Sequence, residues 1–152
     1  MIPTLHVLSI GSPETVEVVR DALTLRARCK LYVATCTGDF SVVSVSEEVD
    51  VAILHDTFSR CELRVLAANI RRRWPHARIL LIQGKSEGLV TGMYDEQVAP
   101  GISTEPLLAV IERLGASVRQ ERRLGVNKGY AYQGPIQHKW RSPQARGLLR
   151  NA

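Results

Sequence analysis

The stretch Asp50-Val51-Ala52-Ile53-Leu54-His55 decides the fold of this chain. Its centre is an unbroken run of four apolar residues, which is typical of a strand buried on both faces of a parallel sheet. Residues 79–82, Ile-Leu-Leu-Ile, repeat this pattern downstream. Residues 5–10 and 30–35 are β-rich, and residues 97–98 fit a short last strand. We therefore predict five strands in one sheet.

Segments with helical periodicity separate most of these strands. One helix is predicted over residues 12–25 and a second over residues 59–74, where Ser59 and Glu62 form a capping box. A last helix is predicted from residue 103 to Gly115. Strand alternating with helix indicates an open α/β sheet with helices on both faces, in which ligands bind beyond the carboxyl ends of the strands.

The segment between the second and third strands, residues 38–49, is ambiguous. Its valines favour a strand, but neighbouring parallel strands need a crossover connection. We predict a short, poorly formed helix there.

Charge divides the chain into two parts. Residues 1–117 contain 12 Lys/Arg and 14 Asp/Glu, whereas residues 118–152 contain 8 Lys/Arg and a single Glu. The second part is also rich in Gly and Pro and shows neither apolar period. We predict one domain over residues 1–117 and a basic, flexible tail over residues 118–152, with helix only in its first turns.

Composition excludes several classes of protein. No apolar run approaches the ~20 residues that span a bilayer, and the N-terminus has no secretory pattern. The three cysteines form no CxxC motif and have no histidine at ligand spacing. We expect a cytoplasmic protein that binds no metal and no cofactor.

Over residues 4–115 the chain resembles the receiver domains of bacterial response regulators, the CheY-like family, which have a flavodoxin-like fold. In that family an Asp and four apolar residues lead to the Asp that accepts phosphate. Asp50 and the apolar run fit this pattern, but His55 stands at the acceptor position and Asp56 comes one residue later.

The other positions of the family's phosphorylation site also differ. The magnesium-binding acids are replaced by Gly11-Ser12, the Thr or Ser by Gln83, and the Lys before Pro100 by Ala99. The degenerate site therefore consists of Gly11, Ser12, His55, Asp56, Gln83, Ala99 and Pro100. Phosphoryl transfer needs a carboxylate nucleophile, a cation held by clustered carboxylates, and a Lys and a hydroxyl for the phosphoryl oxygens. The resemblance thus implies a pseudo-receiver that is not an enzyme and regulates by contact with a protein partner.

A second departure concerns the partner surface. Only seven residues separate Gly84 from Gly92, where receivers have a full helix. The fourth helix is therefore expected to be shortened or absent. An altered interaction surface is predicted near Leu89, Val90 and Met93.

The tail supports a second hypothesis, a nucleic-acid-binding protein. Cations and aromatic residues alternate in it, as they do in proteins that bind single strands. The residues concerned are Arg122, Arg123, Lys128, Tyr130, Tyr132, Lys139, Trp140 and Arg141. A basic exposed tail without a specific role would have the same composition.

Three further interpretations stay open on sequence alone. The crevice around Gly11, His55 and Gln83 could bind a small molecule, although no nucleophile–base pair is visible. His55 is expected to be partly exposed. Residues 71–74, Arg-Arg-Arg-Trp, are expected to complement the helix dipole and pack the Trp, rather than bind nucleic acid. The oligomeric state is not predicted.

Overall fold

The structure, a computed structural model, describes residues 3–35, 40, 42–44, 47–55, 57–84 and 92–125. Five parallel strands form one sheet in the order β2-β1-β3-β4-β5. They are β1 Leu5–Ile10, β2 Cys29–Ala34, β3 Val51–His55, β4 Arg78–Ile82 and β5 Glu96–Val98. This order confirms the predicted flavodoxin-like α/β class, whose switch point lies between β1 and β3.

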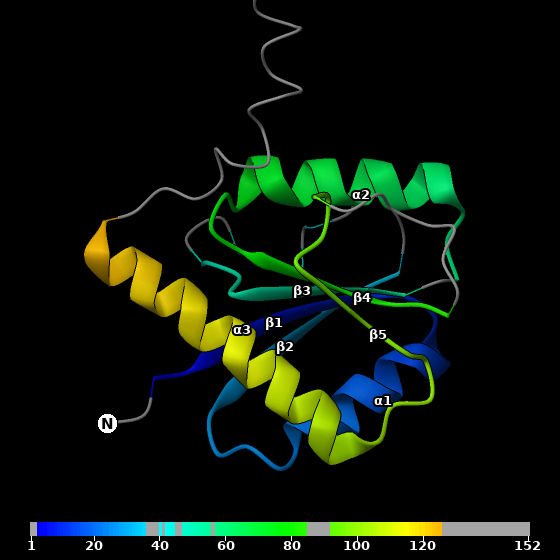
Figure 1. The fold of residues 1–152 in the computed structure, drawn as a ribbon, viewed down its shortest axis with the longest axis horizontal. Helices are drawn as coiled ribbons and strands as arrows, with labels where there is room; N and C mark the ends of the chain where they lie inside the picture. The colour runs from blue at the N-terminus through cyan, green and yellow to red at the C-terminus, as the bar shows by residue number, and fades with distance from the viewer. Residues whose placement is uncertain are drawn as a thin grey trace, which may run out of the picture.

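Three described helices cover the sheet. They are α1 Pro13–Leu23, α2 Arg60–Arg73 and α3 Thr104–Leu124. Figure 1 shows α2 on one face of the sheet and α1 with α3 on the other. The seven residues 85–91, on which the predicted loss of a helix falls, lie outside the described residues.

Two hydrophobic layers follow from the alternation of side chains along each strand. Leu8, Leu54 and Leu81 face α2, whereas their neighbours Val7, Ile53 and Leu80 face α1 and α3. All six are fully buried. The apolar runs of β3 and β4 are continuous because both of their faces are covered.

The C-terminal end of α2 fixes the segment after β2. Trp74 is 3% exposed and its ring lies 5.3 Å from that of Phe40. The Arg73 guanidinium lies 4.7 Å from the Trp74 ring and donates hydrogen bonds to the carbonyls of Phe40 (3.2 Å) and Val43 (2.8 Å). Because Trp74 is buried, it cannot stack on a base. The packing interpretation of residues 71–74 therefore holds.

The helix predicted within residues 38–49 is absent from the part of this segment that the structure describes. Residues 40, 42–44 and 47–49 lie outside both helix and strand. The other residues of the segment are not described. Contacts with Arg73 and Trp74 hold Phe40 and Val43 in place without a helix.

The predicted end of the last helix at Gly115 is wrong. Helix α3 continues to Leu124 and ends at Gly125, whose φ of 73° is left-handed. Gly115 has a different role, since a methyl group there would lie 2.5 Å from Leu5 Cδ1. Val118 and Glu121 are buried, so the helix crosses the predicted boundary after residue 117 while packed against the body.

None of the helices in the described ranges is long and apolar enough to cross a membrane.

Candidate functional site

The carboxyl ends of β1, β3, β4 and β5 meet at one edge of the sheet, as predicted. The turn after β1 carries Gly11 and Ser12, and β3 ends at His55. Gln83 follows β4, and its backbone N–H donates to the Val98 carbonyl of β5 at 3.1 Å. The sheet thus brings Gly11, Ser12, His55 and Gln83, four residues of the predicted degenerate site, to one edge.

His55 is buried, contrary to the prediction that it is partly exposed. It is the last residue of β3 and is 2% exposed. Its Nε2 lies 3.4 Å from the hydroxyl oxygen of Ser9, which is fully buried. Ser9 pairs with Ile53 in the parallel register, so its side chain lies on the same face as that of His55. This pair is a polar contact within the layer covered by α1 and α3.

Gly11 lets the imidazole of His55 lie directly against the turn into α1. A methyl group on Gly11 would lie 2.9 Å from His55 Cδ2 and 2.5 Å from Thr15 Oγ1. The Gly11 N–H donates to the Ala34 carbonyl at 3.2 Å, which ties the turn to β2. The close approach explains why a residue without a side chain occupies this position.

Ser12 acts as the N-terminal cap of α1. Its hydroxyl accepts a hydrogen bond from the Thr15 N–H at 3.4 Å, and Thr15 Oγ1 donates to the Ser12 carbonyl at 2.9 Å. The hydroxyl therefore satisfies a free amide of the first turn of α1.

The β4 and β5 side of this edge carries no charge at the predicted positions. Gln83 is 5% exposed, and its carbonyl accepts a hydrogen bond from Gln97 Nε2 at 3.4 Å. Ala99 and Pro100 are exposed at the end of β5. Asp56 lies outside the described residues. Within the described ranges, no group of three His, Cys, Asp or Glu side chains could hold a metal ion.

The predicted interaction residues differ in how far they are buried, and several are not described. Met93 is partly buried and packs against the layer under α2. Arg123 is exposed on the last turn of α3. Leu89 and Val90 are not among the described residues, and neither are Lys128, Tyr130, Tyr132, Lys139, Trp140 and Arg141.

Arg122, which the sequence places in the basic tail, instead binds the body. Its Nη1 lies 2.6 Å from Asp50 Oδ1, and its Nη2 lies 3.2 Å from Glu48 and 3.3 Å from the Val49 carbonyl. Asp50, which is buried, also accepts the His6 N–H at 2.9 Å. The sequence contains a signal that Arg122 belongs to a helix, since basic residues before a glycine are typical of a helix end.

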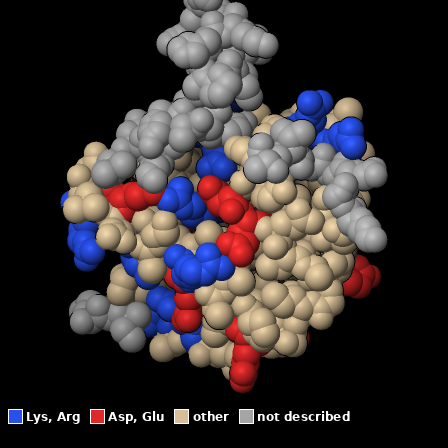
Figure 2. Space-filling view, in the orientation of Figure 1, with Lys and Arg blue, Asp and Glu red and all other residues tan. Residues whose placement is uncertain are grey.

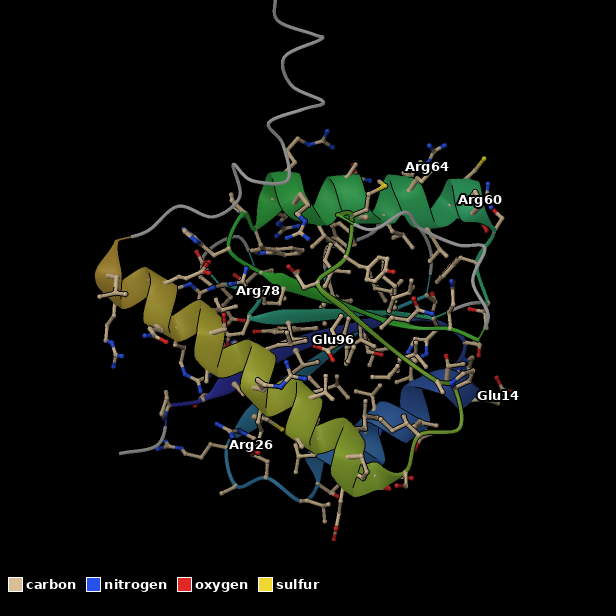
Figure 3. The ribbon with its side chains drawn as sticks, in the orientation of Figure 1. Glu14, Arg26, Arg60, Arg64, Arg78 and Glu96 are labelled. Atoms are coloured by element: carbon tan, nitrogen blue, oxygen red, sulfur yellow. The ribbon has the colours of Figure 1, made fainter. Side chains whose placement is uncertain are left out.

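Other ion pairs join α3 to the strands around it. Arg78 of β4 donates to Ser117 at 2.9 Å and pairs with Glu121, and Arg113 pairs with Glu96 at 3.0 Å. Figure 2 shows positive and negative side chains interleaved on this part of the surface, and Figure 3 labels Arg78 and Glu96 within it. Arg78 and Arg113 are therefore both paired with carboxylates.

A hydrogen-bonded cluster lies on the edge strand β2. Tyr32 donates to Glu47, and Lys30 pairs with the same carboxylate at 2.9 Å. Burial, followed by the hydrogen bond to Glu47, raises the pKa of Tyr32 well above its ordinary value. The hydrogen bond from Tyr32 lowers the pKa of Glu47. A phenol with a raised pKa stays protonated near neutral pH, so Tyr32 acts here as a hydrogen-bond donor to Glu47 at the edge of the sheet.

Comparisons with known proteins find likeness in structure only. No family model matches the sequence, and no curated protein matches it. The signal receiver domain of an HD domain-containing protein from Pseudomonas fluorescens Pf-5 is similar, with a TM-score of 0.66 and 16% identity over 78% of this chain and 92% of that one. A CheY-like receiver domain protein from Methanospirillum hungatei JF-1 has a TM-score of 0.64 and 12% identity over 78% and 99%.

A third similar structure was solved with a bound small molecule. The response regulator TrrA from Thermotoga maritima, solved in complex with Mg²⁺–BeF, has a TM-score of 0.56 and 20% identity over 72% of this chain and 98% of that one. In each case nearly the whole receiver domain is matched by residues of the body. The chain therefore has the fold of a response-regulator receiver domain.

Proposed function

We propose that this chain is a pseudo-receiver, a regulatory module that acts through protein contact and without phosphoryl transfer. The observation that carries the proposal is the state of His55. At the position where receivers present a reactive carboxylate, this chain has an imidazole that is 2% exposed and lies 3.4 Å from Ser9. A buried imidazole of this kind is a packed part of the sheet and not an accessible nucleophile.

The surroundings of His55 support the same conclusion. Gly11, Gln83 and Ala99 supply neither carboxylates for a divalent cation nor a cation for the phosphoryl oxygens. The Ser12 hydroxyl is used in capping α1. At the described positions Gly11, Ser12, Gln83 and Ala99, this edge therefore has uncharged groups and forms a hydrogen-bonded junction between strands.

A regulatory module without a phosphorylation switch must act through a constant surface or through a ligand other than phosphate. We propose a protein as the partner and the cytoplasm as the location.

The phosphate analogue bound by TrrA provides the test. Full-length protein is heated with and without Mg²⁺ and beryllium fluoride, with TrrA treated in parallel as the positive control. A ligand at 100 times its Kd would add about 2.7 kcal/mol of stability, which raises the Tm by several degrees. We expect no change for this chain and an increase for TrrA.

Two results would contradict the proposal. One is a rise in Tm with the analogue, and the other is covalent labelling by a small phosphodonor. The regulatory part is tested by affinity capture from the source cells. The same protein partner should be retained before and after phosphatase treatment, and after nuclease treatment.

Nucleic-acid binding by the tail is the second candidate function. The observation that favours it is charge, since residues 126–152 contain five Lys/Arg and no Asp/Glu whereas residues 1–125 contain fifteen of each. Binding of this kind would weaken steeply with salt, because each neutralised phosphate releases counterions. It would also disappear when the chain ends at Gly125.

A further inference from the structure

Two helices on opposite faces of the sheet have exposed outer surfaces of opposite charge. Helix α1 lies on one face and α2 on the other (Figure 1). The first surface is acidic and the second is basic. Each also contains an exposed valine, Val18 on α1 and Val65 on α2.

The acidic surface, here called the α1 face, consists of Glu14, Glu17, Val18, Asp21 and Leu25. The spacing of these residues places them along one side of α1 and the turn that follows it. Val18 is 38% exposed and Leu25 is 56% exposed. Glu17 pairs with Arg20 at 3.2 Å, which leaves Glu14 and Asp21 to give the α1 face its charge.

The basic surface, here called the α2 face, consists of Arg60, Arg64, Val65, Ala68 and Arg72. Figure 3 shows Arg60 and Arg64 on the side of α2 that is turned away from the sheet. Val65 is 51% exposed between them and Arg72. Glu62 is the one acid of α2 and accepts the Ser59 N–H at 2.8 Å in the capping box, and the three arginines of this face outnumber it.

The two faces complement each other in charge and in pattern. Each has exposed aliphatic groups flanked by charges of one sign, which is how pairs of surface helices select their partners. We infer that the α1 face of one molecule binds the α2 face of a second copy of this chain. This inference does not depend on the proposed regulatory function.

The symmetry of this contact follows from the fold. Because the faces lie on opposite sides of one sheet, the contact is head-to-tail and does not close into a dimer. Molecules would therefore add one after another as concentration rises. Exposed ion pairs contribute little individually and the surface is small, so we expect a Kd on the order of 0.1 mM.

The first measurement is sedimentation of the full-length protein from well below to well above that concentration. At low salt the average mass should rise steadily past that of a dimer. At high salt it should return to that of a monomer, because screening weakens contacts between exposed charges. A monomer at every concentration would overturn the inference, and so would a dimer that grows no further.

Paired charge reversals identify the surfaces. One variant carries Glu14→Lys and Asp21→Lys, which makes the α1 face basic, and the other carries Arg64→Glu and Arg72→Glu, which makes the α2 face acidic. Each variant alone should associate at least tenfold more weakly, because both of its faces then have the same sign. An equimolar mixture of the two should regain association, since the reversed α1 face of the first variant meets the reversed α2 face of the second, and their unreversed faces also have opposite charges.

The mixture also separates this inference from misfolding, because a misfolded variant would not be rescued by the other. Glu105→Lys and Arg123→Glu serve as controls, since both change exposed charges on α3, outside the two faces. They should leave association within about twofold of the unmodified protein. Failure of the mixture to associate, or equal weakening by the controls, would assign the contact elsewhere.

Discussion

Gly11 connects the end of β1 to the start of α1 at the point where the buried His55 ring is closest. The space that a side chain would need is already filled by the His55 imidazole and the Thr15 hydroxyl. The turn is also fixed by its hydrogen bond to Ala34. The packing at this edge therefore requires a glycine at position 11.

We predict that Gly11→Ala destabilises the protein by roughly 1–3 kcal/mol, because the added methyl group must displace the buried His55 ring or the Thr15 hydroxyl. Urea unfolding with an unchanged m-value measures the difference. Gly101→Ala is the matched control, since a methyl group there meets nothing within 4 Å. Equal effects of the two substitutions would show that space at Gly11 is not limiting.

The sequence predicts that His55 lies at the end of a strand, but it does not predict that His55 is buried. The apolar run of residues 51–54 places His55 at a strand end, since only a buried strand has such a run. The burial of His55 depends on Ser9 and Gly11, which come from another strand and a turn far away in the chain. No local pattern contains that information.

At the scale of elements, the N-termini of two helices differ in how they are capped. Ser59 accepts the Glu62 N–H at 3.2 Å and Glu62 accepts the Ser59 N–H at 2.8 Å, which completes a capping box at α2. Ser103 occupies the same position at α3 but makes no side-chain hydrogen bond there. The same residue type thus has two different roles.

We predict that Ser59→Ala lowers the free energy of unfolding by about 1 kcal/mol, the usual contribution of a helix cap. Ser103→Ala should cost only a few tenths of that, because no capping hydrogen bond is lost. Chemical denaturation of the two variants side by side provides the comparison. A larger loss for Ser103→Ala would mean that α3 is capped in solution by a bond that this structure does not contain.

The helix ends show where sequence patterns fail and why. The sequence predicts the end of the last helix at Gly115, because a glycine after the last periodic residue is typical of a helix end. The actual role of Gly115 is to let α3 approach Leu5 of β1, and a tertiary contact of that kind leaves no local signal. Gly125 is the true end, and the preceding Arg122-Arg123-Leu124 carried the usual signal of a last turn.

At the scale of the whole molecule, the second half of α3 joins parts of the chain that are far apart in sequence. Arg122 binds Asp50 across 72 residues, and Arg78 binds Glu121 across 43. Val118, which precedes both of these helix residues, is fully buried. The packed body therefore extends to Gly125.

We predict that a chain ending at Gly125 keeps the stability of the full-length protein within about 0.5 kcal/mol. A chain ending at Ser117 should lose roughly 3 kcal/mol or more, since it loses the burial of Val118 and leaves the buried Asp50 carboxylate without Arg122. Thermal or urea unfolding of the three lengths tests this. Equal stability of the two shortened chains would restore the boundary predicted from composition.

Because α3 is the last element of the body, it is also the last to be synthesised. The layer formed by Leu5, Val7 and Ile53 is closed by Leu107 and Ile111 of this helix. A ribosome adds roughly 5–20 residues per second, so roughly 6–23 seconds pass between the synthesis of Ile10 and that of Leu124. During that time one side of the nascent sheet has no cover from α3. The interval is a window for chaperone binding or aggregation, and it closes only when the last helix is complete.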